Sequence, residues 1–284
     1  MNQALPETPP VAVVTGAANG LGLGFATVLA RQDMTVVLAD IEAAALARAE
    51  SGLLTAGHNA ISAIVDLTVE NEVNAFAAQS LARHGKVDVL CLNAGVSIAG
   101  HAWDLSVSDW RWVYDVNVFA NVYALRAFLP AMIARDSGRV VFTVSNSAVT
   151  TIPQRAPYVS SKHALLSIAE TVQRELESIG SGVRVAAVLP GAIRSTMADA
   201  TRNRPAAYGR AEVPAEVRDA ARAFLEQYGA DPVAMADDVL RAVFADDRFY
   251  IFTGAEDLDM HRMRSEDIEA GRLRPLQPTE VPGS

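Results

Sequence analysis

A tyrosine and a lysine stand four positions apart in the segment "APYVSSKHALLS". If this segment is helical, Tyr158 and Lys162 share one face and are separated by a rise of about 6 Å. A free phenol has a pKa of about 10 and is a poor acid or base at neutral pH. A neighbouring ammonium group favours the phenolate and lowers that pKa, which would make Tyr158 a usable general acid and base. A solvated helix face explains the pair alone equally well, so other residues must decide.

Two polar residues upstream are candidates for the same site. Ser145 ends the apolar run "VVFTVS", where its hydroxyl could donate a hydrogen bond to a substrate oxygen. Asn117 falls inside a long stretch with helical spacing. A short amide is unfavourable in the middle of a helix unless it has a partner, so Asn117 requires an explanation.

A glycine-rich turn, "TGAANGLG", follows the first apolar run and precedes a helical pattern. Gly16, Gly20 and Gly22 remove Cβ atoms where backbone N–H groups at a helix N-terminus could approach a pyrophosphate. An ordinary strand–helix turn would explain two of these glycines. Their position after the first strand and before a helix favours a dinucleotide site.

An acidic residue ends the second predicted strand, as a dinucleotide site requires. Asp40 could accept hydrogen bonds from both ribose hydroxyls of NAD, and its charge would repel the extra phosphate of NADP. No Arg or Lys occupies 17–19 or 41–42 to bind that phosphate. The sequence therefore predicts NAD rather than NADP, although Asp40 could instead cap the following helix.

Two further strand ends fit a bound cofactor. Asp66 could receive the adenine amino group, and Asn93 ends the fourth predicted strand. In open α/β sheets the ligand crosses the carboxyl ends of the strands, so both positions are expected to line it. Each residue alone could be a turn residue or a helix cap.

Short apolar runs alternate with amphipathic stretches along most of the chain. Several runs are almost continuously apolar, as strands buried on both faces of a parallel sheet must be. The predicted strands lie within 11–17, 35–40, 60–68, 87–95, 138–145, 183–191 and 248–254. The predicted helices cover 21–32, 42–56, 69–84, 108–135, 157–179 and 232–245. This alternation indicates a Rossmann-like α/β fold, with a doubly wound, mainly parallel sheet of seven strands flanked by helices.

The chain is predicted to form one domain over 11–254, because no Gly-, Ser- or Pro-rich linker and no internal repeat interrupts it. Residues 1–10 are expected to be a disordered lead-in and residues 255–284 a tail. The segment 192–231 is polar and then amphipathic, and its length is typical of a functional loop. We expect it to form a mobile lid over a substrate.

Composition excludes several classes of protein. The net charge of −9 and the pI near 5.1 argue against nucleic-acid binding, which needs clustered Lys and Arg. The single cysteine, Cys91, lies in an apolar run and rules out a disulfide framework, which fits a reducing cytoplasm. The apolar runs are expected to be too short to span a membrane, and the first residues are not expected to form a signal peptide. The histidines show no metal-ligand spacing, so no metal is predicted.

Taken together, the motifs resemble those of the short-chain dehydrogenase/reductase family over residues 10–254. They occur in the family's order: the glycine turn, two aspartates, "NAG", Asn117, Ser145, "YVSSK" and "PG". The ordered set is far more specific than a Tyr-x-x-x-Lys match. The resemblance implies hydride transfer between a nicotinamide cofactor and a substrate carbon.

The same resemblance implies the roles of four catalytic residues. Tyr158 would exchange a proton with the substrate hydroxyl or carbonyl, and Lys162 would lower its pKa and hold the nicotinamide ribose. Ser145 would orient and polarise the substrate oxygen. Asn117 would kink its helix and hold a water in a proton relay.

Cofactor contacts follow from the resemblance in the same way. Ile193 would contact the carboxamide through its backbone, while Ser195 stands where the family more often has threonine. The predicted NAD-binding residues are Gly16, Asn19, Gly20, Leu21, Gly22, Asp40, Ile41, Asp66, Leu67, Asn93, Ala94, Gly95, Tyr158, Lys162, Pro190, Gly191, Ile193 and Ser195.

These observations predict an NAD-dependent oxidoreductase for a bulky, apolar or aromatic secondary alcohol or the matching ketone. The alternatives are an NADP-dependent ketone reductase and a catalytically idle NAD-binding regulator. The stretch "TRNRPAAYG" resembles segments of bacterial family members that oxidise benzylic alcohols of lignin-derived aryl ethers or terpenoid alcohols. Its arginines could bind an anion or be solvated loop charges. The excess of large apolar residues in 108–135 predicts a homo-oligomer, a tetramer or dimer, because another subunit would cover them.

Overall fold

The computed structural model describes residues 9–211 and 213–275 of the chain, so most of the predicted lead-in lies outside the described residues. Its centre is a seven-stranded parallel sheet in the order β3-β2-β1-β4-β5-β6-β7. The strands are β1 (Val11–Thr15), β2 (Thr35–Asp40), β3 (Ala60–Ile64), β4 (Val89–Leu92), β5 (Arg139–Thr143), β6 (Arg184–Leu189) and β7 (Tyr250–Phe252). Each strand lies within a predicted run, and the predicted doubly wound α/β fold is confirmed.

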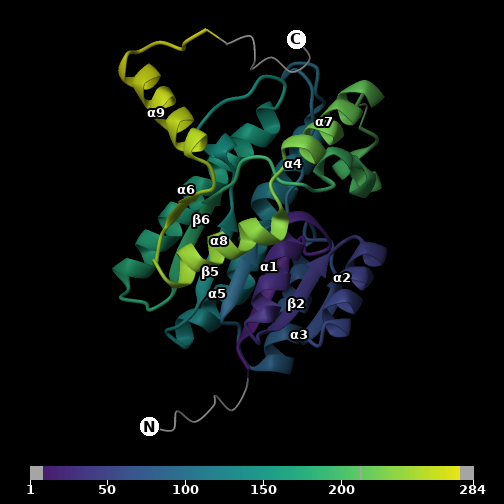
Figure 1. The fold of residues 1–284 in the computed structure, drawn as a ribbon, viewed down its shortest axis with the longest axis vertical. Coiled ribbons are helices and arrows are strands. Elements are labelled where there is room, and N and C mark those ends of the chain that lie inside the picture. Colours follow the sequence, from purple (N-terminus) through teal and green to yellow (C-terminus); the bar gives the residue numbers. More distant parts are fainter. Residues whose placement is uncertain (1–8, 212, 276–284) are drawn as a thin grey trace.

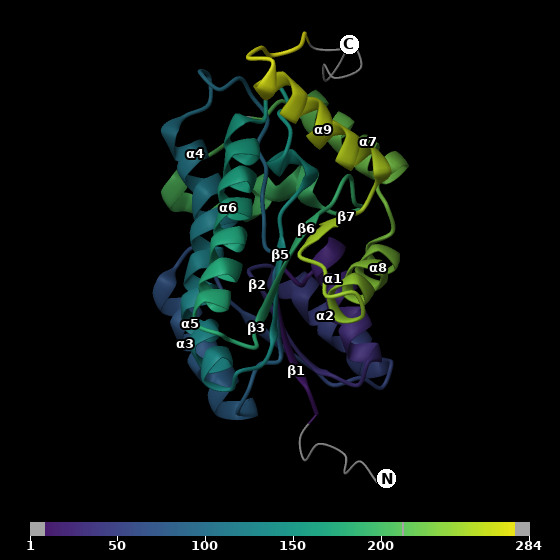
Figure 2. The ribbon, with the colours of Figure 1, turned by 90° about the vertical axis from the view of Figure 1, so that its left-hand side faces the viewer.

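Helices cover both faces of the sheet, which is seen edge-on in Figure 2. One face packs against α3, α5 and α6, and the other packs against α1, α2 and α8. Neighbouring residues of a strand enter opposite layers, as Leu90 and Cys91 do, which explains why the strands are apolar at almost every position. These helices are α1 (Gly20–Arg31), α2 (Ala43–Thr55), α3 (Glu70–His84), α5 (Ala120–Ala134), α6 (Ala156–Ser178) and α8 (Pro232–Phe244).

The long helix expected over 108–135 is interrupted. It consists of α4 (Val107–Tyr114), one π-helical turn, η1 (Asp115–Phe119), and α5. The combined stretch 107–134 contains an 18-residue window with a mean hydropathy of 1.4 and is long enough to cross a membrane, so our expectation that no apolar run has that length is wrong here. Its residues Phe128 and Met132 pack in the core, as those of a buried helix do.

Two regions beyond β6 contain helices that the sequence did not suggest. The predicted lid holds the short helices η3 (Met197–Asn203) and η4 (Ala206–Tyr208), followed by α7 (Ala215–Tyr228). The predicted tail begins with α9 (Ala255–Glu269). Both α7 and α9 lie with α4 at the end of the molecule toward which the strands' carboxyl ends point (Figure 1).

Candidate active site

The tyrosine and lysine of the "YVSSK" segment lie on α6, as predicted. The ammonium nitrogen of Lys162 lies 5.8 Å from the ring centre of Tyr158. It donates a hydrogen bond of 2.9 Å to the carbonyl oxygen of Thr143, at the end of β5. Lys162 is only 2% exposed, and this burial lowers its pKa to about 7. The ammonium group is therefore held at the carboxyl end of β5, and its removal from water costs considerable solvation free energy.

The environment of Tyr158 differs from the expected one. Burial raises the pKa of Tyr158, and a hydrogen bond with Ser145 and the charge of Arg155 partly counteract it. We expected Lys162 to lower this pKa, but Lys162 is not among its causes here. The ammonium nitrogen of Lys162 faces the ring and donates to the carbonyl of Thr143, so it does not bond to the phenol oxygen.

Ser145 belongs to a hydrogen-bonded chain that starts in the C-terminal helix. Its hydroxyl donates to Oδ1 of Asn146 at 3.2 Å and accepts from the backbone N–H of Ser147 at 3.1 Å. The amide of Asn146 donates to Oδ1 of Asp257 at 2.8 Å. Asp257 is 2% exposed, and burial raises its pKa. Sequence reasoning missed both Asn146 and Asp257, because only the fold brings α9 to this strand end.

Asn117 has the partners that its position inside a helix required. It lies in η1 and is fully buried. Its amide donates to the carbonyl of Val96 at 3.0 Å and to the hydroxyl of Ser161 at 2.9 Å, and its Oδ1 accepts from the N–H of Val96 at 2.8 Å. Asn117 thus joins the loop after β4 to the helix that holds the tyrosine and lysine.

The glycine turn has the shape that a dinucleotide needs. Gly16 and Gly20 adopt positive φ angles of 64° and 55°. A Cβ on Gly22 would lie 2.1 Å from the carbonyl oxygen of Gly16, and one on Gly20 would lie 2.9 Å from the Cβ of Ser195. The amide of Asn93 holds the turn by donating to the carbonyls of Thr15 and Gly16. The glycines therefore let the turn pack closely on itself and on the loops after β4 and β6, which is the tight turn that a dinucleotide site needs at a helix N-terminus.

Asp40 ends β2 beside this turn. Its carboxylate accepts hydrogen bonds from the backbone N–H groups of Ala18 and Glu42, both at 3.0 Å. Burial raises the pKa of Asp40, although these hydrogen bonds lower it in part. Arg202 of the lid forms an ion pair with Glu42, so a cation does lie near the end of β2. Positions 17–19 and 41–42 did not reveal it, because Arg202 is distant in the sequence.

The other predicted cofactor residues gather at the same edge of the sheet. The carboxylate of Asp66 accepts hydrogen bonds from the N–H and the hydroxyl of Thr68. It therefore caps its own turn, which is the alternative interpretation given above. Gly191 donates to Thr253, and Ile193 forms a β-bridge with Ala230. The rest lie on the loops that follow β1, β2, β3, β4 and β6 or at the start of α1: Asn19, Leu21, Ile41, Leu67, Ala94, Gly95, Pro190 and Ser195.

One arginine of the lid is not a solvated loop charge. Arg204 forms an ion pair of 2.5 Å with Asp109, its side chain is 3% exposed, and its guanidinium lies 5.3 Å from the ring centre of Trp112. It also donates to the carbonyl of Tyr208. These contacts attach the lid to α4.

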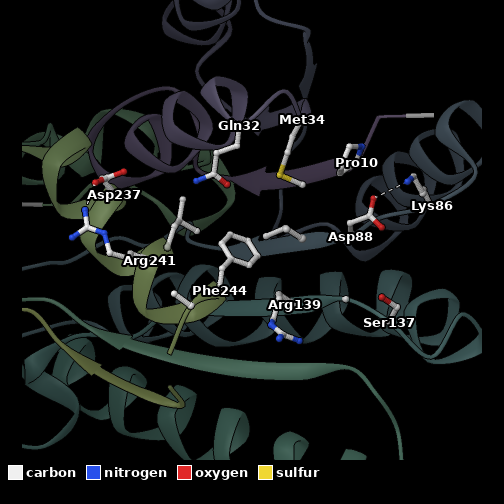
Figure 3. A pocket seen from close by; sticks show the side chains of 14 residues that line it. Pro10, Gln32, Met34, Lys86, Asp88, Ser137, Arg139, Asp237, Arg241 and Phe244 are labelled. Atoms are coloured by element: carbon white, nitrogen blue, oxygen red, sulfur yellow. Dashed lines mark hydrogen bonds and ion pairs between the residues drawn. The ribbon is translucent and has the colours of Figure 1, made fainter. Parts of the chain in front are cut away.

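A pocket of about 650 Å³ lies away from these residues. It is lined at the amino ends of the strands by side chains such as Met34, Asp88 and Arg139, and Phe244 of α8 closes one side (Figure 3). Lys86 and Asp88 form an ion pair of 3.3 Å there. It contains none of the predicted catalytic or cofactor residues, all of which lie at or beyond the carboxyl ends.

Comparison with known proteins identifies the family. The model of the family described as short chain dehydrogenase matches residues 10–206. The chain belongs to this family. A relative from Streptomyces avermitilis, a 1-deoxy-11-beta-hydroxypentalenate dehydrogenase, is 35% identical over 256 residues, which span 87% of this chain and 86% of the relative.

Solved structures of the family agree with this assignment. A short-chain dehydrogenase/reductase from Burkholderia phymatum in complex with NAD is 34% identical, with a TM-score of 0.89 over 96% of this chain and all of that one. A metagenomic short-chain oxidoreductase in complex with NADP is 30% identical, with a TM-score of 0.68 over 87% of this chain and 96% of the other. The protein is thus an oxidoreductase that acts on hydroxyl or keto groups with a nicotinamide cofactor.

Proposed function

We propose that this protein is an NAD-dependent dehydrogenase that oxidises a bulky secondary alcohol or reduces the corresponding ketone. The observation that carries the proposal is the arrangement around α6. The phenol of Tyr158 forms a hydrogen bond with Ser145, the ammonium of Lys162 lies 5.8 Å from the ring centre, and Asn117 joins the adjoining loop to the same helix. The tight glycine turn lies at the same edge of the sheet.

The chain's own residues would handle the proton of the reaction. In oxidation, the phenolate oxygen of Tyr158 takes the hydroxyl proton of the substrate, and the carbon–oxygen single bond becomes a carbonyl. Ser145 turns its hydroxyl from Asn146 toward the substrate oxygen and orients it. The nicotinamide cofactor, when bound, would supply the acceptor for the hydride that leaves the carbinol carbon. Lys162, already placed beside the tyrosine ring, would hold the nicotinamide ribose.

The preference for NAD rests on Asp40. A carboxylate at the end of β2 suits two ribose hydroxyls and repels a phosphate. One observation favours the second candidate, an NADP-dependent ketone reductase: Arg202 lies against Glu42, two residues beyond Asp40. Arg202 is already paired with that carboxylate and with Thr196, so it is less available for a phosphate than a free arginine would be.

The substrate proposal is supported by residue chemistry and by a relative's name. The name of the Streptomyces avermitilis relative denotes a hydroxylated carboxylate as its substrate. A bulky alicyclic or aromatic secondary alcohol fits the same class of reaction. We place the enzyme in the cytoplasm, because a nicotinamide cofactor and an unpaired cysteine suit a reducing compartment.

Assembly into a homo-oligomer, a tetramer or dimer, is part of the proposal. Large apolar side chains remain exposed at the ends of the helices on one face of the sheet, such as Phe119 at 45% and Ile179 at 63%. On the other side, Phe244 of α8 is 40% exposed, and Tyr250 of the edge strand β7 is 51% exposed. Contact with further copies of the chain would remove these groups from water.

The proposal is tested by two measurements on the purified protein. Protein-fluorescence titration with NADH and NADPH compares the two affinities, and tighter binding of NADPH would contradict the argument from Asp40. A panel of alicyclic, aryl and terpenoid secondary alcohols is then followed by the appearance of NADH absorbance. Absence of turnover with every alcohol and every matching ketone would favour the idle NAD-binding regulator.

A further inference from the structure

A second cation flanks the tyrosine, on the side opposite the lysine. Arg155 is the residue immediately before α6, so it stands three positions ahead of Tyr158 and on the same side of the helix start. Its Nη1 donates a hydrogen bond of 3.0 Å to the hydroxyl of Ser97. Its charge is close enough to Tyr158 to favour the phenolate.

Arg155 has no acidic partner among residues 9–211 and 213–275. Other arginines near the site are paired with carboxylates: Arg202 with Glu42, Arg204 with Asp109 and Arg222 with Asp199. The only hydrogen bond that the side chain of Arg155 makes within this part of the chain is the one to Ser97. No side-chain nitrogen of Arg155 is both fully buried and without a hydrogen-bond partner. The N–H groups that do not bond to Ser97 are therefore accessible to a ligand.

Leaving this guanidinium without a counter-charge costs free energy. Burial lowers the pKa of Arg155, since partial removal from water disfavours the charged form. A guanidinium presents several N–H donors in a planar fork that matches a carboxylate. Arg155 is thus prepared for an anion that the folded chain does not itself provide.

The position of Arg155 points to the substrate rather than the cofactor. Lys162 and Arg155 are seven residues apart, a distance of about 10 Å along a helix axis, with Tyr158 between them. The loop after β4 runs alongside the start of α6 in the same order. Gly95 lies beside Lys162, and Ser97, two residues later, contacts Arg155. If Lys162 holds the nicotinamide ribose, Arg155 lies on the far side of the reacting hydroxyl.

We propose that Arg155, held by Ser97, binds a carboxylate of the substrate, so that the enzyme acts on a hydroxy acid or the corresponding keto acid. The inference rests on the proposed function, because it needs the substrate to react at Tyr158. It narrows the substrate class from secondary alcohols to those with an anionic group near the reacting carbon.

The test is a binding measurement, which is independent of turnover. Isothermal titration calorimetry on the full-length protein saturated with NADH compares adamantane-1-carboxylate with adamantane-1-carboxamide. The wild type is expected to bind the carboxylate at least about tenfold more tightly, the contribution of one charge-assisted hydrogen bond. Arg155→Gln should remove this preference, and Arg155→Lys should restore part of it.

Matched controls separate this inference from a change in net charge or in folding. Arg174→Gln removes the same charge from an exposed position further along α6 and should keep the wild-type preference. NADH affinity should be the same in all four proteins, which verifies that each is folded. Equal binding of the two probes by the wild type, no binding of either, or an unchanged preference in Arg155→Gln would overturn the proposal. Failure of NADH binding or of alcohol turnover would instead count against the proposed function.

Discussion

Replacing Lys162 with methionine should make the cofactor-free protein more stable at neutral pH while it abolishes turnover. The ordinary pKa of a lysine, 10.5, is that of the unfolded chain, and in the fold burial lowers the pKa of Lys162 to about 7. Between these values the unfolded chain binds a proton that the native protein lacks. The free energy of unfolding therefore rises with pH from about 7 to 10.5 and is lowest, through this group, at pH 7 and below.

The magnitude follows from the gap between the two pKa values. Each pKa unit corresponds to about 1.36 kcal/mol, so the charge of Lys162 costs at most about 4 to 5 kcal/mol at pH 7. Methionine has a similar shape but leaves the carbonyl of Thr143 without its donor, which costs about 1–3 kcal/mol. A net gain of about 1–3 kcal/mol is expected at pH 7. At pH 10 the native lysine is neutral while the unfolded one is still mostly protonated, so the remaining cost is only about 1 kcal/mol and the gain should vanish or reverse.

Urea unfolding followed by circular dichroism at pH 7 and pH 10 measures this difference. Lys86→Met is the matched control, because Lys86 is ion-paired with Asp88 and only partly buried. That variant should show no stabilisation at pH 7. A Lys162→Met protein that is less stable than wild type at pH 7, or a difference that does not change with pH, would refute the reasoning.

Three further changes test other parts of the site. Gly22→Ala should weaken NADH binding and lower the melting temperature, because its Cβ would lie 2.1 Å from a backbone oxygen. Gly52→Ala is the control, since no atom lies within 4 Å of its Cβ, and it should stabilise the protein by about 0.5–1 kcal/mol in calorimetry. Asp40→Ala should shift the ratio of NADH to NADPH affinity toward NADPH by about tenfold or more in fluorescence titration, and an unchanged ratio would contradict the role given to Asp40. Asp257→Leu leaves the amide of Asn146 without its acceptor and should lower kcat about tenfold with NADH affinity unchanged, whereas Asp257→Asn should recover most of the rate in a steady-state assay.

The sequence predicted the layers of the fold well because its signals there are local. The seven strands are short and almost continuously apolar, and glycine or polar residues mark many of their ends, so periodicity alone located them. Carboxyl ends of parallel strands meet at one edge, which also predicted that Asp40 and Asn93 would lie near the glycine turn. These positions follow from topology, without knowledge of side-chain packing.

What the sequence did not predict depends on contacts between distant segments. Asp257 reaches Asn146 only because α9 folds back over the end of β6, and neither residue stands out in a motif. The single helix expected over 108–135 contains a π-turn that periodicity cannot distinguish from α-helix. Arg204 was read as a possible loop charge, yet it is buried against Asp109 and Trp112, a partner set that no local pattern indicates.

The central claim is that Tyr158 transfers the proton of a redox reaction in a site that also binds NAD. Tyr158→Phe removes only the phenolic oxygen and keeps the ring beside Lys162. With a secondary alcohol that the wild type oxidises, stopped-flow absorbance should show NADH formation reduced by at least about a thousandfold, at the upper part of the range for general acid–base catalysis. NADH affinity, measured by fluorescence on the same preparation, should stay within about twofold of wild type. Turnover at the wild-type rate in Tyr158→Phe would contradict the account.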